Sequence, residues 1–146
     1  MTAVVLVVAL TVALVGGVVG VLMVTTGGAD QADVQVDGAE LVVTPVGMMK
    51  VWALSSGVRV PLADVAAARA VDRATLPLGF RAPGSYFPGV VCAGTYRKVG
   101  SKGLWMVGRS RLVLDLELRG ERYQRVVVQV ADPVASAATV ERACGR

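Results

Sequence analysis

The chain has no histidine and only two cysteines, Cys92 and Cys144. Histidine is the commonest general base in enzymes, and a zinc site needs three or four ligand side chains, so the usual residues for both chemistries are missing. Ser55 and Ser56 lie outside any G-x-S-x-G pattern, and residues 99–103 lack the G-K-[ST] ending of a phosphate-binding loop. We therefore expect a protein that is not an enzyme and that uses no cofactor and no metal ion.

Charged residues are absent from positions 1–29, and residues 3–24 form a nearly unbroken apolar run of Val, Leu, Ala and Gly. These 22 residues are enough for a helix that crosses a hydrocarbon core about 30 Å thick. A cleaved secretory signal is the alternative, with a cleavage site near Asp30, but the run is longer than a signal core and no base precedes it. We expect a retained transmembrane helix over 3–24 and a single-pass protein of the cell membrane.

The flanks of this run carry no Lys or Arg, since the first base of the chain is Lys50. The positive-inside rule therefore gives almost no information here, and it does not decide which side of the membrane the rest of the chain occupies. The base-free segment after the run and two cysteines that could pair give a slight preference for the extracytoplasmic side. Gly16 and Gly20 form a G-x-x-x-G pair, which would let two copies of the chain dimerise through this face.

Short apolar stretches separated by turn residues follow a polar segment. Residues 25–40 are rich in Gly and Asp and have no periodic apolar face, so they predict a polar linker. Apolar and β-branched residues then predict a meander of short strands at 41–44, 48–54 and 58–62. Residues 62–72 fit neither a helix nor a strand clearly, and we interpret them as a turn that leads into a strand around 67–71.

The clearest pattern in the chain is the alternation over 111–118, in which leucines take every second position. A period of two predicts a strand whose leucines face the core, while Asp115 and Glu117 face solvent. The connection Arg119–Gly120–Glu121 predicts a tight hairpin that returns the chain as a strand over 123–130. The two strands should therefore form an antiparallel pair.

The last segment changes from a period of two to a helical period. Asp132 and Pro133 have the residue types of an N-cap and a first helical position, and Gly145 is placed to end the helix. The predicted helix should cover the sheet with one apolar face, which consists of Val134, Ala137, Ala138 and Val140.

Three stretches resemble the bacterial pleckstrin-homology-like (PH-like) domains of small membrane-anchored proteins. They are "LVVTPVGMMKVWALSSGVRVPLADV" (41–65), "APGSYFPGVVCAGTYRKVG" (82–100) and "YQRVVVQVADPVASA" (123–137). The resemblance implies that 41–144 form a mainly β domain, a small antiparallel barrel or bent sandwich with one C-terminal helix. In such a fold the Pro–Gly pairs at 83–84 and 88–89 would bend the middle strands.

Eukaryotic PH domains that bind phosphoinositides use basic residues in the loop between the first two strands. The corresponding residues here, 44–50, contain only Lys50, so the resemblance implies no phosphoinositide site. We expect a membrane-tethered, non-catalytic module that serves as an interaction or scaffold domain for an unknown protein partner.

The alternative is a domain that binds anionic lipid surfaces. Residues 40–146 carry all 15 Lys and Arg residues but only 8 of the 11 acids. Arg97, Lys98 and Lys102 would lie in one hairpin, close enough to meet lipid head groups together. No nucleic-acid partner is expected. Cys92 and Cys144 could form one disulfide if the domain faces an oxidising compartment.

Overall fold

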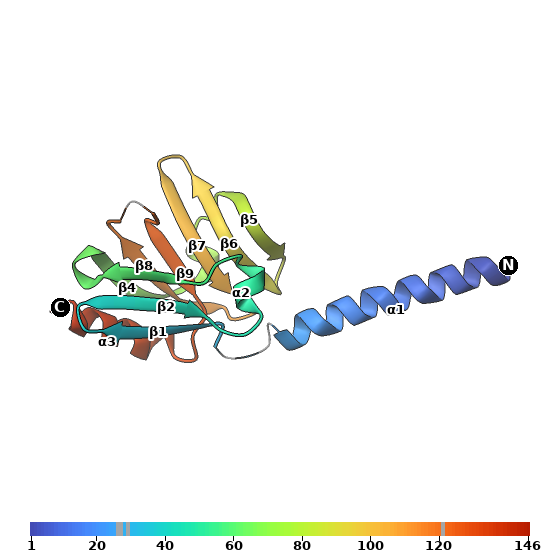
Figure 1. The fold of residues 1–146 in the computed structure, drawn as a ribbon, viewed down its shortest axis with the longest axis horizontal. Coiled ribbons are helices and arrows are strands. Elements are labelled where there is room, and N and C mark those ends of the chain that lie inside the picture. Colours follow the sequence, from blue (N-terminus) through green and yellow to red (C-terminus); the bar gives the residue numbers. More distant parts are fainter. Residues whose placement is uncertain (26–27, 29, 121) are drawn as a thin grey trace.

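A computed structural model describes residues 1–25, 28, 30–120 and 122–146, apart from the side chains of 22, 23, 25 and 81–83. The fold is mainly β, as the sequence predicts. An N-terminal apolar helix, α1 (Thr2–Thr25), leads to a β domain of two sheets with a C-terminal helix, α3 (Pro133–Ala143) (Figure 1). None of the segment Thr2–Val21 is buried, and this segment is long and apolar enough to cross a membrane.

The smaller sheet holds three antiparallel strands in chain order. They are β1 (Ala32–Asp37), β2 (Glu40–Pro45) and β3 (Val58–Pro61). The predicted polar linker over 25–40 is therefore wrong for the residues of β1. Its sequence, ADVQVD, alternates small or apolar residues with polar ones, so Ala32 is buried while its polar neighbours stay at the surface.

A one-turn helix, α2 (Met49–Trp52), takes the place of the strand predicted at 48–54. Met49 and Ala53 are four positions apart, so a helical turn buries both against the core; a strand would also place Val51 on their face, but Val51 is 56% exposed. The opposite side of the turn leaves Met48, Val51 and Leu54 exposed.

The larger sheet holds six strands in the order β4-β8-β9-β7-β6-β5. Their bounds are β4 (Val65–Asp72), β5 (Phe80–Phe87), β6 (Val91–Lys98), β7 (Ser101–Val107), β8 (Leu112–Leu118) and β9 (Arg125–Val128). The predicted strand at 67–71 is confirmed within β4. β8 and β9 pair as predicted, although residue 121 of their connection lies outside the described residues.

One pairing departs from the all-antiparallel prediction, because β9 runs parallel to β7. The chain leaves β7, skips one strand position to form β8, and then returns as β9 in the gap between them. The two edge strands of this sheet, β4 and β5, are not paired with each other, so the sheet is open rather than a closed barrel. The Pro–Gly pair at 83–84 lies at a register shift of β5, and that at 88–89 lies in the β5–β6 turn.

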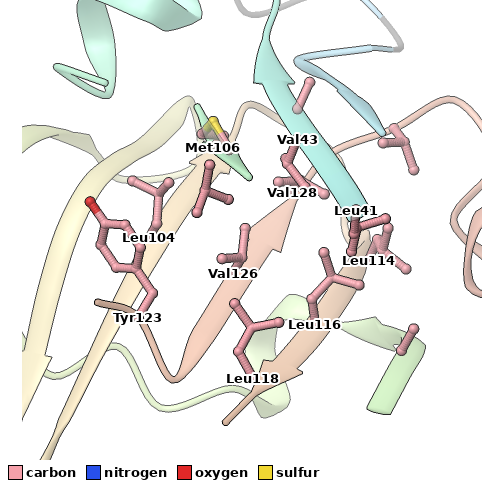
Figure 2. Close-up of a cluster of buried hydrophobic side chains, with 14 of the residues drawn as sticks. Leu41, Val43, Leu104, Met106, Leu114, Leu116, Leu118, Tyr123, Val126 and Val128 are labelled. Carbon is pink, nitrogen blue, oxygen red and sulfur yellow. The ribbon is translucent and has the colours of Figure 1, made fainter. Parts of the chain in front are cut away.

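The main core lies between the two sheets. The inner face of the larger sheet meets residues of β2, as Figure 2 shows for Leu114 and Leu116 near Leu41. α3 contacts β4 and β8 at the side of this core. The side-chain oxygen of Asp132 accepts a hydrogen bond of 2.9 Å from the backbone N–H of Ala135, which confirms the N-cap.

The buried face of α3 differs from the predicted one. Pro133, Ala137 and Val140 are buried, whereas Val134 and Ala138 are exposed. The helix therefore lies on the sheet with a face rotated away from the predicted one. Gly145 has a φ of 78° just after the helix, a conformation that favours glycine.

The outer face of the larger sheet is also covered, and this overturns the predicted exposure of Asp115. Leu76 and Leu78 lie on a second apolar cluster, whose buried members are Cys92, Tyr96, Trp105, Val107, Val113 and Val127. β8 thus buries both faces, and Asp115 is only 2% exposed.

Candidate functional site

The β domain has two distinct ends. The backbone N–H of Gln31 donates to the carbonyl of Gln129 at 2.9 Å, and Val46 N–H donates to the carbonyl of Gln31 at 3.0 Å. The chain that arrives from α1 therefore joins the domain beside the ends of β2 and β9, and we call this the anchor end. The β6–β7 turn and the C-terminus lie away from α1, at what we call the distal end (Figure 1).

A groove of about 340 Å³ opens on the outer face of the larger sheet near the distal end. We call it the distal groove. Its floor and walls include Tyr96, Lys98, Gly103, Trp105, Glu117 and Arg125. These residues come from four strands, and alternation along each strand points them to the same face.

Two aromatic side chains form the floor of the distal groove. Tyr96 and Trp105 are 5% and 3% exposed, and their rings meet edge to face with centroids 6.0 Å apart. Gly103 keeps the space above Trp105 open, because a Cβ at this position would lie 3.4 Å from the indole nitrogen. A side chain here would fill the groove, so Gly103 helps to define its depth.

Paired charges form one wall of the groove. Arg125 Nε lies 3.0 Å from Asp115 Oδ1, and Arg125 Nη2 lies 3.2 Å from Glu117 Oε1. Arg69 on β4 also pairs with Glu117. Burial raises the pKa of Asp115, and the charge of Arg125 partly opposes this rise. The wall therefore offers paired, opposite charges to a partner rather than a single free acid or base.

The three basic residues predicted to contact lipid lie in the β6–β7 hairpin, on both of its faces. Arg97 and Lys102 are opposite each other in the β6–β7 register, so their side chains share the inner face. Lys102 Nζ lies 5.1 Å from the centre of the Tyr123 ring. Lys98 is opposite Ser101 and points to the outer face, and both Lys98 and Lys102 border the distal groove. All three lie at the distal end.

Cys92 and Cys144, the pair of the possible disulfide, are free thiols in this structure. Cys92 belongs to the outer cluster, whereas Cys144 packs against the main core on the other side of the sheet. Burial raises the pKa of the Cys92 thiol, which keeps it protonated. Within the described ranges, no three His, Cys, Asp or Glu side chains come together as metal ligands.

The sequence prediction singled out Lys98 but missed Trp105, Gly103 and Arg125. The missed residues lie on two strands that are far apart in the chain, and only the parallel β7–β9 pairing brings them together. Gly103 is opposite Arg125 in that register. The period of two within each strand was the one local signal, since it places Lys98 on the same face as Tyr96, and Gly103 on the same face as Trp105.

No protein-family model, curated protein or solved structure matches this chain. The function is therefore inferred from the geometry of the chain alone, and the PH-like resemblance stays a prediction.

Proposed function

We propose that this chain is a single-pass membrane protein whose PH-like, non-catalytic domain binds a protein partner at the distal groove. The observation that carries the proposal is the position of the groove at the end of the domain opposite α1. The eight residues of β6 run from the anchor end to the distal end, a length of about 23 Å. An anchored domain would hold the groove away from the bilayer, where a partner can reach it.

The chemistry of the groove favours a protein partner. Tyr, Trp and Arg are enriched where protein interfaces bind tightly, and the groove combines Tyr96, Trp105 and Arg125. Its volume of about 340 Å³ lies at the small end of ligand pockets, so it suits one or two side chains of a partner segment. The exposed ammonium group of Lys98 at the rim would favour an acidic residue in the partner segment.

The second candidate is a binder of anionic lipid through Arg97, Lys98 and Lys102. Against it stands the distal position of this hairpin, since the bilayer that holds α1 lies at the anchor end. The Debye length is about 8 Å at physiological salt, far less than the length of β6, so these charges would not sense that membrane. The hairpin could only meet a second membrane.

A site-specific photo-crosslinker at Ser101, which lines the groove, tests the proposed partner site in cells that express the full chain. We expect one discrete protein adduct that is lost in the Lys98→Glu variant. The matched control is a crosslinker at Val134, which is 60% exposed on α3 and distant from the groove. Equal adducts at both positions, or an adduct that survives Lys98→Glu, would contradict the proposal.

Two further measurements test the anchor and its orientation. The full chain should resist carbonate extraction, and deletion of residues 2–25 should release it into the soluble fraction. The free thiols remove one of the two reasons for an extracytoplasmic domain, and the base-free segment after α1 remains. A reporter fused after Arg146 that is active only outside the cytoplasm should therefore be active, and a cytoplasmic reporter should be silent.

A further inference from the structure

We infer that the anchor end carries a membrane-contact surface that inserts into the interfacial region of the same bilayer that α1 crosses. The inference rests on the proposed membrane anchor. We call this surface the interface patch, and its members are Val46, Met48, Val51, Leu54, Tyr86 and Phe87. It consists of the segment around α2 and of the adjoining β5–β6 turn.

The patch consists of exposed apolar and aromatic side chains. Val51, Leu54 and Phe87 are 56%, 66% and 51% exposed, and the other members exceed 40%. Residues 46–54 carry a single charge, Lys50, and residues 85–91 carry none. A contiguous apolar surface of this kind usually marks a contact with a partner or a membrane.

The chain holds this patch close to the end of α1. α1 ends at Thr25, and the carbonyl of Gly28 already accepts a hydrogen bond of 2.8 Å from Gln129 Nε2. Three residues span at most about 10 Å, so the domain cannot move far from the membrane surface. The hydrogen bond from the backbone N–H of Val46 to the carbonyl of Gln31 then places the start of the patch beside the point where the chain enters the domain.

Trp52 of α2 lies on the side of the domain that faces α1. It lines an open hollow together with Ala13, Leu14, Gly17, Val18 and Val21 of α1. Trp52 therefore faces the second half of α1 across this hollow. Among the described residues, its indole Nε1 is buried and has no hydrogen-bond partner.

These properties match the interfacial region of a bilayer. Tryptophan is enriched there because its large apolar ring sits well at the boundary between the hydrocarbon and the head groups. Lys50 can extend its ammonium group toward the head groups while its aliphatic stem stays with the apolar residues. A bilayer accounts both for the exposed apolar side chains of the patch and for the position of Trp52 beside α1.

The β5–β6 turn would give the domain a second point of contact. α2 contacts β6, and Cys92 near the start of β6 is opposite Val107 at the end of β7, so the turn lies at the anchor end. Phe87 and Tyr86 precede this turn. Two contacts and the tether together would fix the tilt of the domain, so that the distal groove points away from the bilayer.

Depth-dependent tryptophan quenching tests the inference with the full chain in phosphatidylcholine vesicles that contain lipids brominated near the head group. The chain has two tryptophans, and Trp105, which is 3% exposed and lies on the outer face, serves as the internal reference. We expect strong quenching that is mostly lost in the Trp52→Phe variant. Equal quenching in both proteins, while both stay with the vesicles in carbonate, would overturn the inference. Release of the protein by carbonate would instead contradict the proposed anchor.

A second variant keeps Trp52 in place and charges the patch. Val51→Asp combined with Leu54→Asp alters only exposed side chains, so the fold should persist by circular dichroism. We expect a red shift of the Trp52 emission and weaker quenching. Val99→Asp is the matched control, because Val99 is 99% exposed in the β6–β7 turn at the distal end, and it should change neither quantity. Unchanged quenching in the double variant would also overturn the inference.

Discussion

Arg125 Nε lies 3.0 Å from Asp115 Oδ1, and this pair joins β9 to β8 where Asp115 is almost fully buried. Replacement of Arg125 by Ala would leave a buried carboxylate without its nearest cation. We expect Arg125→Ala to lower the free energy of unfolding by about 3 kcal/mol. Denaturant unfolding of the full chain in detergent micelles measures this change.

A matched double variant separates the cost of an unpaired charge from the value of the pair itself. Asp115→Leu combined with Arg125→Met removes both charges and keeps apolar volume, so it should recover most of the stability. If the double variant is as unstable as Arg125→Ala, then lost packing rather than the uncompensated charge of Asp115 causes the effect.

Glu141 ties α3 to β4 in a pH-dependent manner. Its carboxylate accepts hydrogen bonds from Arg146 at 2.7 Å and from the backbone N–H of Ala68 at 2.7 Å. Chiefly the bond from Arg146, and then that from Ala68, lowers the pKa of Glu141 below 4.5. An acid whose pKa is lower in the folded state contributes stability above its unfolded pKa and loses it as the pH falls.

We therefore expect wild type to be more stable than Glu141→Gln at neutral pH. The difference should shrink as the pH falls below 4.5 and through the lower folded pKa. Thermal unfolding at a series of pH values gives this comparison. A difference that stays constant down to acid pH would show that the charge of Glu141 is not what stabilises the contact.

Two leucines of β8 differ in burial, so their replacement tests the position of the core. Leu116 is fully buried between the sheets, whereas Leu112 is 42% exposed at the start of β8. We expect Leu116→Ala to cost about 2–5 kcal/mol of unfolding free energy, and Leu112→Ala to cost clearly less. Equal losses in urea unfolding would mean that the start of β8 is covered in solution.

The two cysteines should differ in reactivity because they lie on opposite sides of the larger sheet. Cys144 is half-buried at the end of α3, whereas Cys92 is 6% exposed. Maleimide should label Cys144 in the folded protein and Cys92 only after denaturation, as peptide mass spectrometry would show. A Cys92–Cys144 crosslinked peptide from non-reduced protein would contradict the structure.

The dimer predicted through Gly16 and Gly20 has free space in this structure. A Cβ added at Gly16 or Gly20 meets no atom within 4 Å, and the same is true of Gly17, which lines the hollow that Trp52 faces. Gly16→Leu combined with Gly20→Leu should reduce crosslinked dimer in membranes. The control is Gly38→Asn in the β1–β2 turn, which should leave the crosslinking unchanged. Unchanged crosslinking in the double variant would refute the dimer.

Three parts of the fold were determined by the sequence alone. The apolar run of α1, the alternating leucines of β8 and the Asp132–Pro133 start of α3 each depend on residues that are neighbours in the chain. Period, composition and capping act locally, so these elements could be predicted without knowledge of their partners. β1 also alternates, but it is short and half of its six residues are polar, so the sequence predicted a linker there.

The tertiary structure alone decided the rest. The run at 48–54 is apolar enough for a strand or a helix, and the burial of Met49 and Ala53 together with the exposure of Val51 fits only the helix. Alternation placed Asp115 on the face opposite the leucines, but exposure of that face depended on whether Leu76 and Leu78 cover it. The distal groove needed the insertion of β9 beside β7, which sets Arg125 opposite Gly103. Local pattern fixes which face a side chain takes, while long-range contacts fix whether that face meets water, core or a partner.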